Sequence, residues 1–169
     1  MMKNLLVAIL FTMSASAFSQ VKIAVVNIQT VITSIKEGKA VMKTLESSFQ
    51  SKQKILQKEE EELKKFQADF QKQDMVLSDK AKEKKREEFT QKYQALQKKT
   101  ADFQKEIQKQ EGDLKKPILD KLKSVIDAVS EEKKVDLTFE LTSAPVIYAA
   151  NKVDITDDVI KAYDKKHSK

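Results

Sequence analysis

The chain has 169 residues, of which 34% are charged, and its formal net charge is +6. It contains two Gly, two Pro and no Cys, which argues against a turn-rich β fold and excludes disulfides, thiol catalysis and thiolate metal sites. The one His, His167, lies near the C-terminus, so a nucleophile–base pair is not expected. Two Gly are too few for a Gly-rich phosphate loop. We therefore expect a protein that is not an enzyme and binds no cofactor or metal.

The first twenty residues have the order of a secretory signal peptide. Lys3 precedes an apolar run from Leu5 to Phe11, and the small residues of a cleavage site follow at 15–17. The run is too short to span a bilayer. The sequence predicts a signal peptide over residues 1–17, with cleavage after Ser19 as the alternative, and an exported, soluble mature protein.

The mature chain begins with a strand pattern. The segment VKIAVVNI, residues 21–28, is apolar and β-branched, which predicts a buried strand. Residues 29–35 then carry apolar side chains at the spacing of one or two helical turns. Gly38 follows, and we interpret it as a junction between this short helix and the next.

A seven-residue apolar period occupies the middle of the chain and is typical of a helix that packs along a partner helix. Its first half consists of Met42, Phe49, Leu56, Leu63, Phe70 and Leu77. The companion positions are mixed: Leu45, Lys52, Glu59, Phe66 and Gln73. The period resumes at Phe89, Leu96 and Phe103, which predicts an antiparallel helical hairpin over residues 36–116. Such an arm would be about 55–60 Å long.

The turn of this hairpin is predicted near residues 75–79. The apolar trio Met75, Val76 and Leu77 closes the first helix, and Ser78 has the character of an N-cap for the second. Asp79 then favours the first turn of that helix through the helix dipole.

The two ends of the chain are expected to form a small body over residues 18–35 and 117–169. Gly112 and Pro117 are expected to break or kink the return helix, before a short amphipathic helix that starts at Ile118. The segment VDLTFEL predicts a half-buried strand, VIYAAN a further strand, and Thr156 the N-cap of a last helix. About 70 residues form a marginal core without disulfides, so we expect an obligate homo-oligomer of unspecified number.

Positive charge is concentrated on the predicted arm. Residues 36–116 contain 21 basic and 16 acidic side chains, whereas the rest of the mature chain contains ten of each. This favours either an ordinary solvated helix surface or a field that attracts an acidic or anionic partner. Nucleic acid is not the expected partner, because Lys alternates with Glu and the aromatic residues lie on the heptad positions.

Taken in order, these segments resemble the Skp (OmpH) family of periplasmic chaperones over the whole mature chain. The residues that carry the resemblance are KIAVVNI at the start, VMKTLE after Gly38, VLSDKAKEKKREEF at the hairpin turn, and VDLTFE followed by VIYAANKVDITDDVIKAYDKK. The closing part is the most specific, with Tyr148, Asp154-Ile155-Thr156 and Val159. Some members of the family have more acidic and apolar arms than this chain.

The resemblance implies an α+β fold in which a long antiparallel helical hairpin projects from a small β-rich trimerisation body. It also implies an ATP-independent periplasmic holdase, a homotrimer that cages unfolded outer-membrane β-barrel proteins between its arms. In that assembly the interface candidates are Ile23, Val25, Leu137, Phe139 and Leu141. Many weak contacts over three arms would hold a client by avidity.

Client contact is predicted first at the tip, by Met75, Val76 and Leu77, with local packing as the alternative. The heptad residues Leu63, Phe66, Phe70, Phe89, Leu96 and Phe103 are interpreted instead as the core of the arm. The basic tip residues Lys82, Lys84, Lys85 and Arg86 are candidates for contact with anionic lipid or lipopolysaccharide, and solvated charge is the other interpretation.

Two other functions remain open from the sequence. The first is an exported coiled-coil scaffold that links folded envelope components through its tips. The second, a cytosolic prefoldin-like subunit, has similar arms but is opposed by the signal peptide. Gly112 is also considered as a hinge that adapts the cavity to client size.

Overall fold

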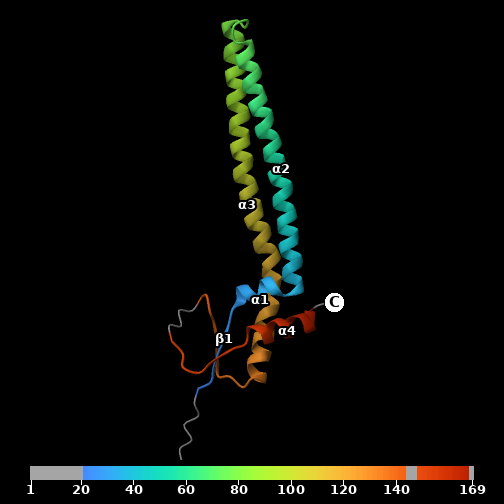
Figure 1. Ribbon diagram of the computed structural model, residues 1–169, viewed down its shortest axis with the longest axis vertical. Coiled ribbons are helices and arrows are strands. Elements are labelled where there is room, and N and C mark those ends of the chain that lie inside the picture. The colour runs from blue at the N-terminus through green and yellow to red at the C-terminus, as the bar shows by residue number, and fades with distance from the viewer. Residues whose placement is uncertain (1–20, 144–147, 168–169) are drawn as a thin grey trace, which may run out of the picture.

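The computed structural model describes residues 21–143 and 148–167. Its elements follow in the order β1 (Ile23–Val26), α1 (Ile28–Ser34), α2 (Lys36–Gln73), α3 (Asp79–Glu132), β2 (Leu137–Glu140), β3 (Lys152–Asp154) and α4 (Thr156–His167). The two long helices α2 and α3 lie side by side as a hairpin that projects from a small body of three strands and two short helices (Figure 1). The predicted α+β class and the hairpin are confirmed. The predicted signal peptide lies outside the described residues.

The hairpin turns where the sequence predicts it. Helix α2 has 38 residues, equivalent to about 57 Å of helix, and ends before Asp74. Ser78 occupies the N-cap position of α3 with φ −69° and ψ 157°, and its carbonyl accepts a 3.0 Å hydrogen bond from the N–H of Lys82. Its side chain makes no capping hydrogen bond. The position of the cap is therefore confirmed, whereas capping by the hydroxyl is not.

Helix α3 does not end at Gly112 or Pro117, contrary to the sequence prediction. It runs for 54 residues from the tip into the body, with Pro117 inside it. A proline within a helix removes one backbone hydrogen bond and usually costs about 3 kcal/mol. Here the next four turns bury Ile118, Leu122, Val125 and Val129, each at most 3% exposed, and this packing keeps the helix continuous.

Gly38 lies inside α2, so its interpretation as a helix junction is also wrong. The junction is Ile35, whose extended ψ of 151° separates α1 from α2. A Cβ built on Gly38 would lie 1.7 Å from the carbonyl oxygen of Ile32. The two helices can cross this closely only because residue 38 has no side chain.

The three strands form a parallel sheet in the order β2-β1-β3. Ile23 pairs with Leu137 and Lys152, and Val25 pairs with Phe139 and Asp154. The strand predicted over VIYAAN is misplaced. Residues 146 and 147 lie outside the described part of the chain, residues 148–151 are not in a strand, and β3 begins at Lys152.

The core lies between the inner face of this sheet and the helices. Ala24 and Val26 face it from β1. On the same face Thr138 Oγ1 lies 2.7 Å from Ser130 Oγ of α3. The largest side chains that fill the core are Ile35, Ile118, Leu122, Ile155 and Tyr163.

Thr156 is not the N-cap of α4 but its first residue. Its N–H donates to Asp154 Oδ1 at 2.9 Å, and its hydroxyl accepts a 3.0 Å hydrogen bond from the N–H of Asn27. Thr156 therefore links the start of α4 to the end of β1, while Asp154 binds the first N–H of the helix.

Candidate functional site

The arm has no buried core over most of its length. All of residues 42–117 are described, and none of their side chains is buried. The six heptad residues that were predicted to form an intra-arm core are half-buried: Leu63, Phe66, Phe70, Phe89, Leu96 and Phe103. Met42 and Phe49 are more open, at 46% and 55% exposure. Two helices alone cannot enclose a seam, so the arm presents an apolar stripe to its surroundings.

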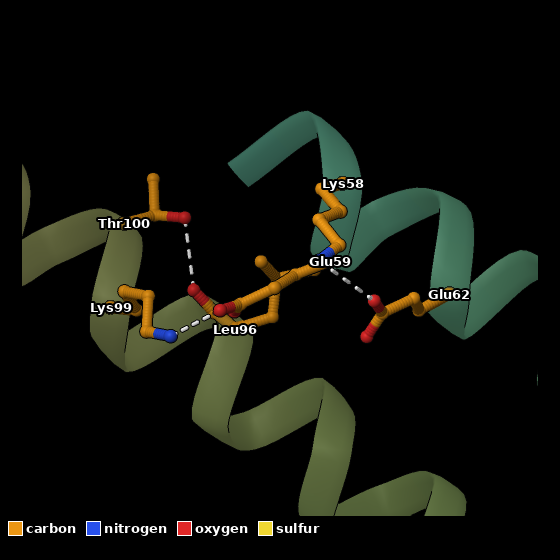
Figure 2. Close-up of polar contacts among 6 residues, drawn as sticks. All are labelled: Lys58, Glu59, Glu62, Leu96, Lys99 and Thr100. Atoms are coloured by element: carbon orange, nitrogen blue, oxygen red, sulfur yellow. Dashed lines mark hydrogen bonds and ion pairs between the residues drawn. The ribbon is translucent and has the colours of Figure 1, made fainter. Parts of the chain in front are cut away.

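Ion pairs between α2 and α3 hold the arm in one antiparallel register. Lys52 pairs with Glu106, and Glu59 pairs with Lys99, as Figure 2 shows for the second pair. At the base Glu37 lies 2.7 Å from Lys121 Nζ. Each step along α2, from 37 to 52 to 59, is matched by an equal step back along α3, from 121 to 106 to 99. Lys52 and Glu59, which look like weak points of the heptad pattern, therefore select the pairing.

Aromatic rings continue this contact toward the tip. Phe66 of α2 stacks on Phe89 of α3 with ring centroids 6.5 Å apart, and Phe89 stacks on Tyr93 at 6.4 Å. Lys85 Nζ lies 4.8 Å from the centroid of the Phe66 ring, in cation–π range.

The tip exposes two of its three predicted contact residues. Met75 is 95% exposed and Val76 is 84% exposed, whereas Leu77 is half-buried. An adjacent pair of nearly fully exposed apolar side chains is costly to keep in water and often indicates an interaction site.

The four basic candidates near the tip differ in their surroundings. Lys82 lies 3.4 Å from Asp74, and Lys85 lies 4.0 Å from Glu88 as well as over Phe66. Lys84 and Arg86 are exposed to solvent. Internal contacts therefore engage two of the four candidates.

The five predicted interface residues lie together on the outer face of the sheet. Alternation along β1 and β2 directs Ile23, Val25, Leu137 and Phe139 away from the core side, and Leu141 continues the same alternation. Leu137 is 50% and Leu141 38% exposed, Ile23 and Phe139 are half-buried, and Val25 is already buried within the single chain at 1% exposure. Among the described strands β2 and β3 are the sheet edges, so each has backbone groups that a further strand could pair with.

A carboxylate at the base of the arm joins three helices. Glu37 of α2 accepts hydrogen bonds from Lys121 Nζ of α3 and from Tyr163 Oη of α4, both at 2.7 Å. Burial alone would raise the pKa of Glu37, but the hydrogen bonds from Lys121 and Tyr163 lower it overall. Burial and the Glu37 carboxylate together raise the pKa of Tyr163. The heptad pattern of the sequence did not indicate this cluster. The available signal was Glu37 itself, an ionisable side chain in the first turn of α2.

A second carboxylate ties β2 to α1. Glu140 accepts hydrogen bonds from Ile28 N–H at 3.3 Å, from Thr142 N–H and hydroxyl at 2.8 Å, and from Ser143 N–H. Burial opposes ionisation, yet the hydrogen bonds from Ser143, Thr142 and Ile28 lower the pKa of Glu140 to about 2.

Within residues 21–143 and 148–167, no helix has the length and apolar character needed to cross a membrane, and no three His, Asp or Glu side chains are grouped to hold a metal ion. The arm and the outer sheet face are the candidate sites of interaction, because both carry partly exposed apolar side chains.

Comparison with known proteins identifies the family. The sequence model of the family described as "Outer membrane protein (OmpH-like)" matches residues 22–163, which include both arm and body. The chain belongs to the OmpH-like family. OmpH-like proteins are chaperones and not enzymes, so the expected absence of an enzymatic activity rests on the family. No curated protein matches this OmpH-like chain.

A solved structure confirms the fold of this OmpH-like chain. It is the crystal structure of an OmpH-like protein from Caulobacter crescentus CB15, provisionally described as an outer membrane chaperone. The two chains are 22% identical with a TM-score of 0.72, and the match covers 88% of this chain and 86% of the other. At this identity the likeness establishes the fold alone.

Proposed function

We propose that this chain is an ATP-independent holdase that, as a homotrimer, encloses unfolded outer-membrane β-barrel proteins between its arms in the periplasm. The observation that carries the proposal is the arm, which is 38 residues long in α2 and has no buried side chain from residue 42 to residue 117. Half-exposed apolar side chains along the whole arm suit many weak contacts with an unfolded chain. Enclosure would then keep that chain from associating with others.

The trimer is supported by the outer face of the sheet. Leu137 and Leu141 are partly exposed beside Phe139, and β2 and β3 are edge strands of a small sheet. An exposed apolar face and two edges are unfavourable for a single chain in water. Association through Ile23, Leu137, Phe139 and Leu141 would cover them and support a body that is marginal alone, whereas Val25 is already covered in the single chain.

The tip is proposed as a first point of client contact. Met75 and Val76 are exposed enough to contact a client without rearrangement of the turn. Lys84 and Arg86 are proposed to contact anionic lipid or lipopolysaccharide, because both are exposed and an anionic surface attracts basic side chains. Export by cleavage after residue 17 belongs to the same proposal, and N-terminal sequencing of the secreted protein tests it.

The decisive experiment is the solution mass of the mature protein, measured by light scattering alone and with a urea-denatured outer-membrane β-barrel protein. We expect the mass of three chains, increased by one client after mixing. A different number of chains, or a trimer that takes up no denatured client, would overturn the proposal. The second result would favour the scaffold, with Met75 and Val76 as a docking site for a folded partner.

The contribution of the tip is tested by the double variant Met75→Ser/Val76→Ser. We expect unchanged unfolding by urea, because both side chains are exposed, and client affinity lower by about fivefold or more through three arms. Tyr148→Ser is the control, since Tyr148 is 83% exposed and lies outside the arm. Equal affinities for the two variants would remove the tip from the client site.

A further inference from the structure

A groove lies between α2 and α3 in the half of the arm nearer the body. Its volume is about 340 Å³. Its apolar lining comes from both helices: Phe49, Leu56, Phe103 and Ile107. Phe49 is 55% exposed, and the other three are half-buried, so the apolar surface is open to solvent.

The polar lining of this mid-arm groove is almost free of charge. Three of the remaining lining residues are glutamines, Gln53, Gln104 and Gln108. The one charged lining residue, Lys52, pairs with Glu106, and its Nζ lies 4.3 Å from the centroid of the Phe103 ring. The charge of Lys52 is therefore engaged by contacts within the arm, and the side chain forms one side of the groove. Uncharged amides that can both donate and accept hydrogen bonds suit a polypeptide backbone.

The mid-arm groove differs from a second groove nearer the tip. That groove is lined by Leu63, Phe66 and Leu96, but Glu59, Glu62 and Lys92 lie among them. The Glu59–Lys99 ion pair, drawn in Figure 2, crosses from α2 to α3, and Glu59 is one of the residues that line this second groove. In the same view the hydroxyl of Thr100, which lines the mid-arm groove, donates to the carbonyl of Leu96 in its own helix.

We propose that the mid-arm groove binds an extended, uncharged segment of an unfolded polypeptide through one large apolar side chain. The apolar lining takes the side chain, while Gln53, Gln104 and Gln108 hydrogen-bond the backbone on either side. A volume of about 340 Å³ is at the small end of ligand pockets, which suits one aromatic or aliphatic side chain. This inference rests on the proposed holdase function and deepens it.

Transmembrane β-barrel strands have the matching chemistry. Their residues alternate between apolar side chains for the lipid and polar side chains for the interior, over about ten residues. In an extended chain every second side chain points the same way, so one apolar residue enters the groove while its neighbours face the amides. A charged residue in place of the apolar one would lose part of its hydration, and the one charged lining residue, Lys52, is already paired with Glu106, so we expect a charged residue to bind much more weakly.

The experiment uses the full-length mature protein and capped peptides of about ten residues, as in a barrel strand. One peptide carries a central Phe among Thr, Ser and Gly, and its match carries Asp in place of Phe. Binding is followed by the NMR shift of the Ile107 δ-methyl group. We expect the Phe peptide to shift this signal saturably and the Asp peptide to leave it unchanged.

Two protein variants test whether peptide binding needs the uncharged glutamines that line the mid-arm groove. Gln53→Glu/Gln104→Glu places two carboxylates on the groove, whereas Gln57→Glu/Gln97→Glu places two on exposed positions of the same helices. We expect the first to bind the Phe peptide about fivefold more weakly or worse, and the second to bind like the natural protein. The single variant Gln104→Glu, with an intermediate loss, guards against a folding defect, and circular dichroism checks helix content in all three.

The outcomes separate this inference from the holdase proposal. Equal peptide binding by the two double variants, or peptide binding without a shift at Ile107, would show that the mid-arm groove is not the peptide site. This would hold even if the trimer captures a denatured barrel protein. Specific peptide binding at Ile107 by a protein that captures no denatured barrel protein would support the groove as a peptide site and overturn the holdase.

Discussion

The hydroxyl of Tyr163, in the last helix, donates a 2.7 Å hydrogen bond to Oε2 of Glu37, in the first turn of the arm. Lys121 binds the other oxygen of the same carboxylate, so α2, α3 and α4 meet at one charged group. Tyr163 is 1% exposed, and little water competes for the bond. The arm is thereby attached to the body by a specific contact as well as by packing.

Removal of this hydroxyl should loosen the attachment. Tyr163→Phe keeps the ring in the core and leaves one oxygen of Glu37 without its donor, at a cost of about 1–3 kcal/mol for a hydrogen bond to a charged group. Urea unfolding at fixed protein concentration measures it. Tyr148→Phe is the matched control, because Tyr148 is 83% exposed and should change nothing measurable. Equal effects of the two substitutions would show that the Glu37 contact does not stabilise the fold.

The register of the arm should depend on its crossing ion pairs. Glu59→Lys places a like charge beside Lys99 and should cost up to about 1 kcal/mol, and Lys99→Glu should behave alike. The double exchange restores opposite charges and should recover most of the loss. A double-mutant cycle from urea unfolding gives the coupling, with the exposed Glu60→Lys as control. No coupling between positions 59 and 99 would contradict the proposed role of the pair.

Much of the arm could be predicted from the sequence, but its register could not. The seven-residue period predicts the two helices, Ser78 and Asp79 predict the start of the second, and the structure has both helices with the turn between them. The short turn between Gln73 and Asp79 limits how far the two helices can slip, and partners such as Lys52 with Glu106, which match the final register, appear only in three dimensions.

The errors in the body have a related cause. The predictions of a helix junction at Gly38 and a break at Pro117 came from local propensities, because Gly and Pro both favour helix ends. In the fold, the close approach of Ile32 to Gly38 and the burial of Ile118 after Pro117 override those propensities. The outer sheet face, by contrast, followed from simple alternation, because β1 and β2 keep a period of two.

The two glycines should respond in opposite directions to alanine. Gly38→Ala would place a Cβ 1.7 Å from the Ile32 carbonyl oxygen and force α1 and α2 apart, so we expect a loss of about 3 kcal/mol or more. A Cβ on Gly112 would meet nothing within 4 Å, so Gly112→Ala should stabilise α3 by about 0.5–1 kcal/mol. Thermal unfolding of both variants checks this.

The same Gly112 variant tests the hinge. A hinge at Gly112 predicts that alanine narrows the range of client sizes the protein accepts. Because α3 is continuous there, an unchanged range together with higher stability would assign Gly112 no role in flexibility.

Acid should weaken the link between β2 and α1 through Glu140. The pKa of Glu140 is lowered from 4.5 to about 2 in the fold, so its contribution is fully present above about pH 4.5 and is lost as the pH falls toward 2. Glu140→Gln should lower stability at pH 7 and flatten the decline between pH 4.5 and 2. Urea unfolding at several pH values measures it, with the exposed Glu131→Gln as control. An unchanged slope in Glu140→Gln would assign the acid sensitivity to other groups.

Association through the outer sheet face makes the sharpest prediction for the body. Leu137 is 50% exposed in the single chain, so Leu137→Asp should not disturb the core of one subunit, but it would bury a carboxylate in the interface. We expect the variant to sediment as a single chain at concentrations where the natural protein is a trimer. Its melting temperature should also be lower and independent of concentration, because a body of this size depends on its partners. Ala128→Asp adds the same charge at an exposed position of α3 and should leave the mass unchanged. If Leu137→Asp keeps the mass of three chains, the outer face is not the interface, and the exposed leucines of the body belong to another contact.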